Sequence, residues 1–316
     1  MTQNTQTAEP VDVLCVGHAS YDLIFSIPHH PASDEKLFAQ DFCAFGGGPA
    51  ANAAVLVARL GLKAAFAGYL GDDLYGDRHL AELQAEGVQT RWVVRGPAPT
   101  PLSAILVKPD GSRSLINYKG QTEPLPSEAL VFDDLNARTI LFDGHEPAIS
   151  VALALRARAL GIPTVLDAGS LHAGTQALMG RVDYLVASEK FAAQFSGAAD
   201  PQAALWRLSE IAPAVVITLG ERGLIWHQNG RSGALAAYPI HATDTTGAGD
   251  AFHGAFAAAL CEGMGWREIL LTASAAGALC CTHTGARPGM PTAIEVANFL
   301  ERFAAPPENA VQGRSS

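Results

Sequence analysis

The stretch Asp-Thr-Thr-Gly-Ala-Gly-Asp-Ala-Phe-His-Gly-Ala-Phe, positions 244–256, decides how the rest of the chain is interpreted. Past its glycines, apolar residues recur at helical spacing, which predicts a helix that begins near Gly247. Thr246 stands where an N-cap hydroxyl would accept an amide hydrogen bond. The first helical turn carries almost no side chain, so its unpaired N–H groups are open to an anion. We therefore predict an anion site at Gly247, Ala248 and Gly249.

Asp250 follows these glycines directly, where its negative charge would repel a bound anion. A carboxylate in that place therefore suggests a separate role, such as taking the proton from an attacking hydroxyl as a general base. The alternative is that Asp250 only complements the helix dipole, as acidic residues in first turns commonly do. The stretch is not a Gly-x-x-x-x-Gly-Lys phosphate loop, and a dinucleotide fingerprint would need Gly or Ala at Phe252.

The stretch resembles the C-terminal signature of the ribokinase-like (PfkB) carbohydrate kinases. The resemblance implies an enzyme that transfers phosphate from ATP to a sugar hydroxyl, with Mg²⁺ as cofactor. In that family the aspartate at the position of Asp250 is the base for the sugar hydroxyl, and the Gly-Ala-Gly amides hold the transferred phosphoryl group. The implied fold is a three-layer α/β/α sandwich with a mostly parallel central sheet and a small antiparallel β lid.

The bulk properties agree with a large acidic domain. The chain has 316 residues, of which 48% are hydrophobic, enough to bury a large core. Its formal net charge of -10, without a cluster of Lys or Arg, argues against nucleic acid and membrane partners. A polyphosphate would have to be held by helix ends and a metal ion.

The five cysteines, an odd number without metal-ligand spacing, predict reduced thiols in a cytoplasmic protein. We expect one kinase domain over residues 11–305, with disordered tails at 1–10 and 306–316. Strand-like segments at about 21–45 and 91–120 interrupt the α/β pattern, and Asp110-Gly111 is a strong hairpin turn signal. The resemblance implies that these segments form the lid and the contact of a homodimer.

Strand and helix patterns alternate cleanly from residue 139 to residue 220, which predicts a parallel sheet covered on both faces. The predicted strands are Thr139–Phe142, Pro163–Leu166, Asp183–Val186 and Ala214–Leu219. Ligands of such sheets bind at the carboxyl ends of the strands. Asp143, Asp167, Ser188, Thr218 and Gly220 all fall there, although polar residues at strand ends are often structural caps.

The resemblance also assigns residues to the sugar. It implies that Asp22, which follows the first strand, and Gly47, Gly48 and Asn52 contact the substrate. A helix is predicted to begin at Pro49 and to end before Gly61. Positions 46–51 also satisfy Gly-x-Gly-x-x-Ala, so a dinucleotide site is the competing interpretation.

On the nucleotide side, the resemblance assigns a phosphate-binding role to Thr218, Gly220 and Gly223. Many family members carry Asn-x-x-Glu after the strand that precedes Ser188, with roles in Mg²⁺ and phosphate contact. Here the segment is Ser-Glu-Lys-Phe, which keeps only Glu189 as an acidic residue. A further set of residues matches the monovalent-cation (K⁺) site of the family: Asp244, Thr246 and Gly285.

Four features together resemble the sulfofructose kinase branch: Gly-Gly-Gly-Pro-Ala-Ala at 46–51, Ile-Asn-Tyr at 116–118, Ser-Glu at 188–189 and the signature at 244–255. In that branch, residues at the positions of Lys36 and Asn117 approach a sulfonate. The arginine of that branch is replaced by His145, which would hold an anion less firmly. We expect a kinase that phosphorylates a hydroxyl, most simply a primary one, on a ketose such as fructose or sulfofructose, or on ribose. A nucleoside kinase of the same fold, a dinucleotide-dependent oxidoreductase and a non-catalytic sugar-binding module are the alternatives.

Overall fold

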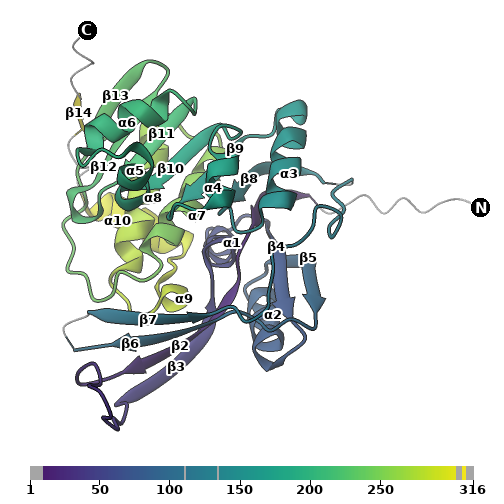
Figure 1. The fold of residues 1–316 in the computed structure, drawn as a ribbon. Coiled ribbons are helices and arrows are strands. Elements are labelled where there is room, and N and C mark those ends of the chain that lie inside the picture. The colour runs from purple at the N-terminus through teal and green to yellow at the C-terminus, as the bar shows by residue number, and fades with distance from the viewer. Residues whose placement is uncertain (1–9, 110–111, 134, 304–307, 311–316) are drawn as a thin grey trace, which may run out of the picture.

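The computed structural model describes residues 10–109, 112–133, 135–303 and 308–310. Within these residues the chain forms one large sheet with helices on both faces and a small sheet that projects from it (Figure 1). The strands of the large sheet, in spatial order, are β14 (Glu308–Ala310), β13 (Arg231–Leu235), β12 (Leu224–Gln228), β11 (Ala214–Thr218), β10 (Tyr184–Ser188), β9 (Thr164–Ala168), β8 (Ala137–Phe142), β1 (Val11–Val16), β4 (Ala64–Gly71) and β5 (Gln89–Gly96). From β11 to β5 all neighbouring strands run parallel, and β12, β13 and β14 add an antiparallel edge.

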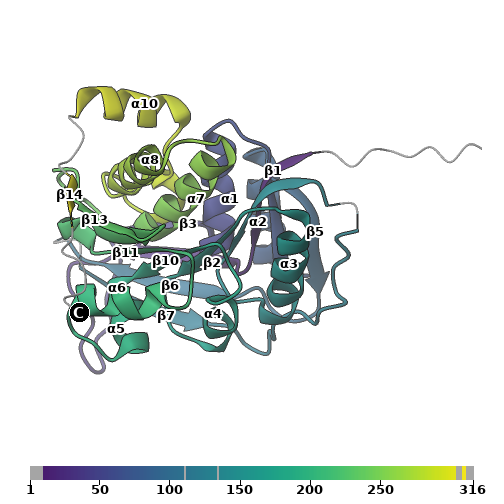
Figure 2. The same ribbon diagram turned by 90° about the horizontal axis from the view of Figure 1, so that it is seen from above.

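Helices cover both faces of this sheet (Figure 2). One face carries α1 (Pro49–Arg59), α2 (Leu74–Ala85), α7 (Ala248–Cys261), α8 (Trp266–Cys280) and α10 (Ala293–Arg302). The other face carries α3 (Pro147–Leu160), α4 (Ala173–Leu178), α5 (Glu189–Ser196) and α6 (Pro201–Ser209). Two short segments complete the described helices, η1 (Gly220–Arg222) and α9 (Ala286–Gly289).

The central strand β1 shows why the layers form. Side chains alternate across a strand, so Val13 and Cys15 enter the core beneath α1 and α7, whereas Leu14 and Val16 enter the core beneath α3 and α5. All four side chains have no exposed surface. A strand buried on both faces needs apolar side chains on both, and in β1 only the half-buried Asp12 departs from this.

The small sheet, which we call the lid, has the order β3 (Asp41–Gly47), β2 (Ser20–Ser26), β6 (Leu102–Val107) and β7 (Arg113–Tyr118). The pairs β2–β3 and β6–β7 are antiparallel, whereas β2 and β6 run parallel. The register aligns Asp22, Ser103 and Asn117 in one row, so their side chains share one face of the lid. The turn signal Asp110-Gly111 lies outside the described residues.

Two expectations are wrong, and a short helix was missed. Residues 92–94, assigned to the lid, belong to β5, which pairs with β4 in the large sheet. The apolar run is the same in either place, and only the pairing partner decides between them. The helix α4 was not predicted, because six residues are too few for a periodic signal. Within the tail expected to be disordered, Glu308–Ala310 form β14 on β13, and the other residues of both tails, apart from Pro10, lie outside the described chain.

All five cysteines are unpaired. None of the helices that the structure describes is long and apolar enough to cross a lipid bilayer.

The packing predicts where the fold is most sensitive. Phe256 of α7 has no exposed surface and lies in the core between α7 and the sheet. Phe256→Ala should lower the free energy of unfolding by about 3–5 kcal/mol, because it leaves a cavity. Leu155→Ala on α3 is the control: Leu155 is 54% exposed, so its loss should change that free energy by about 0.5 kcal/mol or less. Equal losses in urea denaturation would contradict this packing.

Candidate active site

The site lies at the carboxyl edge of the parallel strands, where the lid meets the large sheet. β1 runs through Gly17 into β2, which carries Asp22 on the lid. A Cβ at Gly47 would lie 2.3 Å from Asp22 Oδ2, and one at Gly48 would lie 2.5 Å from His18 O. Gly48 also has a φ of 95°, which side chains rarely adopt. Gly47 therefore allows β3 to approach Asp22 closely, and Gly48 allows the start of α1 to approach the backbone of His18.

The start of α7 provides open backbone donors. Its N-cap is Gly247, with a φ of 79° and no side-chain cap. Ala251 N donates to Gly247 O at 2.8 Å, but in the described part of the chain the amides of Gly249 and Asp250 have no protein acceptor. A Cβ built on Gly249 meets no atom within 4 Å. The first turn of α7 thus presents free N–H groups and the positive end of the helix dipole to an open space.

The expectation that Thr246 caps this helix is wrong. Thr246 Oγ1 instead donates to Asp244 Oδ1 at 2.7 Å, and the cap position is taken by Gly247. A left-handed residue is required there because the chain turns sharply into the helix beside Ala286, whose Cβ would lie 2.4 Å from a Cβ on Gly247. The helix itself begins at Ala248, next to the predicted start.

Asp250 lies beside these amides and is held by α1. Asn52 Nδ2 donates to Asp250 Oδ2 at 2.8 Å, and Asn52 is buried with 2% of its surface exposed. Burial raises the pKa of Asp250, while the Asn52 hydrogen bond and the charge of His253 act in the opposite direction. Oδ1 of Asp250 has no protein hydrogen bond among the described residues, so this oxygen is available to a ligand.

A second buried acid lies behind Asp250. Asp167, at the end of β9, is 7% exposed, and its Oδ2 lies 3.3 Å from His253 Nδ1. The His253 ring also contacts Gly249 O at 2.6 Å and Val186 O at 3.1 Å, so it ties the first turn of α7 to β10. Burial raises the pKa of Asp167 to about 6, against the effect of His253. His253 therefore fixes the backbone beneath the open amides.

Asp143, which follows β8, holds the backbone after β1 and at the start of α1 in place. It accepts hydrogen bonds from the backbone amides of His18 (2.7 Å), Ala50 (3.2 Å) and His145 (2.9 Å). Burial opposes ionisation of this carboxyl, but the His145 side chain and the amides of His145 and His18 outweigh it and lower the pKa of Asp143 to about 2. Gly17 must be glycine, since a Cβ there would lie 1.9 Å from Asp143 Oδ1.

The residues assigned to the nucleotide lie together at the ends of β10 and β11, where Ser188 and Thr218 are in register. The Ser188 hydroxyl accepts from Phe191 N at 3.0 Å and donates to Gly169 O at 2.9 Å, so it caps α5. Glu189 forms an ion pair with Arg222. Gly220 and Gly223 have positive φ values of 61° and 90°, which form the turn between β11 and β12.

Three residues were predicted to bind a monovalent cation, and they do meet. However, Asp244 Oδ2 accepts from Gly285 N at 2.8 Å, and Oδ1 accepts from Thr246 N at 2.9 Å and pairs with Arg113 at 3.2 Å. Both carboxylate oxygens thus face donors, which does not fit a cation at these atoms. The K⁺ site therefore stays a prediction.

The two residues assigned to a sulfonate are placed differently. Asn117 is exposed, and the strand register puts it on the same face of the lid as Asp22. Lys36 is exposed on the β2–β3 connection, with its Nζ 6.0 Å from the ring centroid of Phe38. His145 Nδ1 lies 3.3 Å from Asp143 Oδ1. The His145 ring stacks on that of His18 and lies at a tilt to that of His172. The structure does not bring Lys36 and His145 into a contact.

Sequence reasoning missed three residues at this site. Arg113 reaches from the lid to Asp244 and Thr246, beside the first turn of α7. His253 and Arg287 contact the residues around Asp250 from α7 and α9. A single lid arginine or a helical histidine carries no local signal, because each becomes significant only through its tertiary neighbours. Arg113 and Asn117 share one face of β7, but this alternation alone does not mark either of them as a site residue.

Comparison with known proteins identifies the class. Residues 11–293 match the family model described as pfkB family carbohydrate kinase. The chain is 29% identical to the ribokinase of Bacillus subtilis over 92% of this chain and 99% of the relative. It is 30% identical to fructokinase-1 of Oryza sativa subsp. japonica over 81% of this chain and 88% of the relative.

A solved structure agrees with these relatives. The Arabidopsis thaliana ribokinase complexed with ribose and ATP superposes with a TM-score of 0.82 at 28% identity, covering 94% of this chain and 100% of that chain. The ribokinase-like fold predicted from the sequence is therefore confirmed. The chain belongs to the PfkB family of carbohydrate kinases. The dinucleotide alternative is not supported, since α1 follows a strand of the lid rather than a strand of the parallel sheet.

Proposed function

We propose that this carbohydrate kinase transfers the γ-phosphoryl group of ATP to a hydroxyl, most simply a primary one, of a small sugar such as ribose or a ketohexose. One observation carries the proposal: Asp250 keeps a free carboxylate oxygen directly beside the unpaired amides of α7. The relatives support it, since they are named ribokinase and fructokinase, and the Arabidopsis enzyme was solved with ribose and ATP.

The sugar would lie between the lid and α1. Asp22, half-buried beside Gly47, and Asn117 on the same lid face would hold its hydroxyl groups. Burial raises the pKa of Asp22, against hydrogen bonds from Ser20 and Ser103, which hold the carboxylate in place. These groups would direct the acceptor hydroxyl to Asp250 Oδ1, because Oδ2 is already bound to Asn52.

Asp250 would then take the hydroxyl proton as the oxygen attacks the γ-phosphorus and ADP leaves. The negative charge that spreads over the transferred oxygens would be stabilised by the amides of Gly249 and Asp250 and by the α7 dipole. Arg113, from the lid, brings a side-chain cation to Thr246, beside this turn. Mg²⁺ would supply further charge neutralisation on the phosphates, and Glu189 is the acidic residue at the nucleotide side that would help to hold it.

The nucleotide would lie over the carboxyl ends of β10 and β11, as the family resemblance implies for Thr218, Gly220 and Gly223. The hydroxyl of Ser188 is fully used as a cap, so it contributes to this surface through its position rather than as a free donor. Arg222 offsets the charge of Glu189 at the same edge. Closure of the lid would exclude water and so limit ATP hydrolysis.

His145 bears on the identity of the sugar. Burial opposes protonation of His145, but Asp143 outweighs it and raises the pKa of His145. The paired imidazole is a weak substitute for an arginine, which favours a neutral sugar over sulfofructose. A coupled ADP-release assay with ribose, fructose, sulfofructose and nucleosides separates these substrates. Turnover with nucleosides alone would favour the nucleoside kinase instead.

Asp250→Asn should lower kcat with the best sugar of that screen by roughly 10²–10⁴-fold, the scale of a lost general base. ATP affinity should change little, because the amides of α7 are retained. Glu301→Gln is the control: it makes the same change of acid to amide on the exposed side of α10 and should leave kcat unaltered. Near-normal turnover of Asp250→Asn would refute the base assignment.

Gly249→Ala tests the open amides separately. The new methyl group meets no protein atom within 4 Å, so the melting temperature should hold or rise, since alanine favours helices. The methyl would nevertheless occupy the space that a phosphoryl group needs, and kcat should fall by about 10²-fold or more, the scale of a lost oxyanion donor. Unchanged turnover in a stable Gly249→Ala protein would show that the phosphoryl group lies elsewhere.

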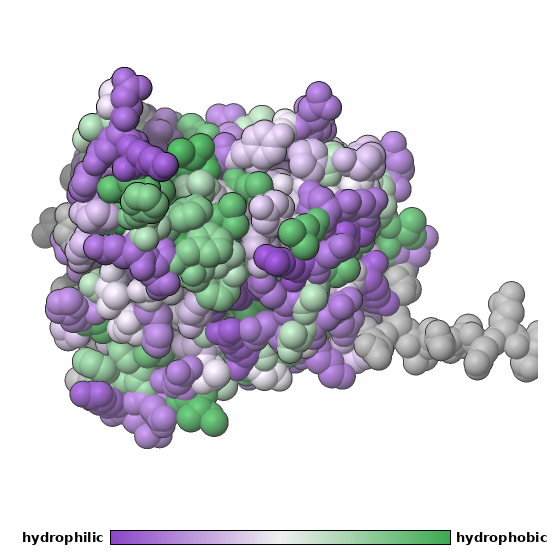
Figure 3. Space-filling view, turned by 90° about the horizontal axis from the view of Figure 1, so that it is seen from below, coloured by the Kyte–Doolittle hydropathy of each residue, from purple (hydrophilic) through white to green (hydrophobic). Residues whose placement is uncertain are grey.

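We also propose that two copies of the chain pair through the outer face of the lid. The strand register places Phe42, Ile116 and Tyr118 on the face opposite Asp22, and they are 54%, 64% and 55% exposed. Figure 3 views the molecule from the side of the lid and shows apolar surface gathered there. A contiguous exposed apolar face of this kind is typical of an interface.

Ile116→Lys should convert a dimer to a monomer, because it places a charge in the apolar face. Analytical ultracentrifugation across protein concentrations measures this directly. Ile294→Lys is the matched control, since Ile294 is 72% exposed on α10, far from the lid in sequence and fold. A wild-type monomer at all concentrations would overturn the dimer proposal.

A further inference from the structure

Arg287 is a buried cation that the proposed mechanism leaves without a role. It lies in the short helix α9 and is only 5% exposed. Burial lowers the pKa of Arg287 to about 10, which still leaves a cation at neutral pH. A buried charge is costly unless its contacts compensate it, so each contact of this side chain is informative.

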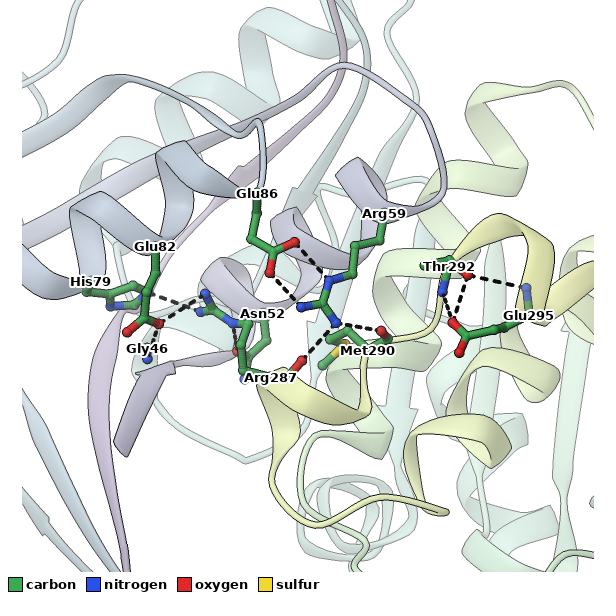
Figure 4. Close-up of polar contacts among 10 residues, drawn as sticks. All are labelled: Gly46, Asn52, Arg59, His79, Glu82, Glu86, Arg287, Met290, Thr292 and Glu295. Atoms are coloured by element: carbon green, nitrogen blue, oxygen red, sulfur yellow. Dashed lines mark hydrogen bonds and ion pairs between the residues drawn. The ribbon is translucent and has the colours of Figure 1, made fainter. Parts of the chain in front are cut away.

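The guanidinium bridges α1 and α2 (Figure 4). Nε donates to Asn52 Oδ1 at 3.3 Å, and Nη2 donates to His79 Nε2 at 3.1 Å. Nη1 forms an ion pair with Glu82 Oε2 at 3.8 Å. Asn52 therefore lies between Arg287 on one side and Asp250 on the other.

The chemistry of these groups fixes the orientation of Asn52. A guanidinium has only donors, so the amide atom that faces Arg287 must be the oxygen. The amide nitrogen then points to Asp250 and donates to Oδ2. Without Arg287, the amide could turn over and present its oxygen to the carboxylate, which would exchange an attraction for a repulsion.

The surroundings of Arg287 hold it rigidly. His79 has no exposed surface, and its ring fits only because position 46 is glycine, where a Cβ would lie 2.3 Å from the ring. Glu82 accepts hydrogen bonds from Gly46 N at 2.7 Å and from the Tyr21 hydroxyl at 3.0 Å, and both donors lie on lid strands. Glu82, the partner of Arg287 in the ion pair, is thus held by one residue of β2 and one of β3.

The backbone of α9 is held as well. Arg59 Nη1 donates to the carbonyl oxygens of Arg287 at 3.0 Å and Met290 at 2.7 Å. The same guanidinium pairs with Glu86 at 2.5 Å and 2.9 Å (Figure 4). Backbone and side chain of Arg287 are therefore fixed from α1 and α2 together.

We propose that Arg287 is a positioning residue for phosphoryl transfer, which sets the amide of Asn52 so that it holds and ionises the Asp250 carboxylate. The inference rests on the proposed function of Asp250 as the base. It also implies that the same pair of residues, Glu82 and Arg287, positions both the lid strands and the base. Arg287 itself does not touch the proton or the phosphoryl group.

The charges around Asp250 give the direction of the effect. The groups that act on it are His253 on its own helix, Asp22 from β2, Asp143 after β8, Asp167 from β9, Cys280 from α8 and Arg287 from α9. Arg287 and the Asn52 donor both favour the ionised form. Their loss should raise the pKa of Asp250, so activity should be lost at a higher pH as the solution is acidified.

The first test uses Arg287→Met, which removes the charge and keeps the volume. With ATP and either D-ribose or D-fructose, whichever turns over faster, kcat should fall about 10–100-fold. The acid limb of the kcat profile should move up by about 1 pH unit. Arg302→Met, an exposed arginine on α10, is the matched control and should leave both unchanged. Melting temperatures show whether each variant is folded at the assay temperature.

A double-mutant cycle then asks whether Arg287 acts through Asn52. Arg287→Met should cost less than about 3-fold in an Asn52→Ala background, because the amide that it orients is gone. Arg287→Lys keeps a donor and a charge but not the planar fork, so kcat should fall while the acid limb stays near the wild-type position. If Arg287→Met does not fold, the kcat of Arg287→Lys in the wild-type and Asn52→Ala backgrounds is compared instead.

An equal loss of kcat in both backgrounds, with an unshifted pH profile, would overturn the proposal and leave Arg287 a purely structural residue. That outcome is distinct from failure of the proposed function. If Asp250 is not the base, Asp250→Asn itself stays active, whatever Arg287 does. If Asp250 is the base and Arg287 is only structural, Asp250→Asn is inactive and the cycle shows no coupling.

Discussion

The hydrogen bond from Asn52 Nδ2 to Asp250 Oδ2 is the contact on which the site depends. It joins the first turns of α1 and α7, two helices about two hundred residues apart in sequence that pack on the same face of the sheet. One carboxylate oxygen is fixed by this bond, so the other is left free at a defined place. The same bond puts that oxygen next to the open amides of α7.

The site must bind a negatively charged substrate although the chain itself is negatively charged. An acidic chain with a formal net charge of -10 must receive a polyanionic substrate. In the proposed mechanism the anion is bound by helix N–H groups rather than by a basic patch, and each nearby acid is surrounded by partners. Asp143 has three backbone donors and His145, Asp167 has His253, and Asp250 has Asn52. Burial without such partners would leave these groups protonated or destabilise the fold.

The lid adds a second level of organisation. Its inner face carries Asp22, Asn117 and Arg113, whereas its outer face carries exposed Ile116 and Tyr118, and the alternation along β7 separates the two sets. The lid is also tied into the body of the protein through Glu82. The contacts of Glu82 with Tyr21, Gly46 and Arg287, and that of Arg287 with Asn52, therefore connect the lid strands to the amide that holds Asp250.

The sequence by itself determined the family, the alternating strands and helices, and the acid and glycines of the signature. It could do so because apolar periodicity and a glycine-rich helix start are local features that need no partner. Local signals failed where a partner decides the outcome. The strand at residues 92–94 looks the same in the lid or in the large sheet, and Thr246 could cap a helix or bond to Asp244.

Only the tertiary structure decided the contacts of Arg113, His253 and Arg287. Each is an ordinary residue in its own segment, and its importance comes from segments far away in the chain. The direction of the Asn52 amide is the clearest case, since it depends on Arg287, which follows it by 235 residues. Hydrogen bonds between distant segments leave no periodic trace in a single sequence, so folding had to bring these groups together before their chemistry could be seen.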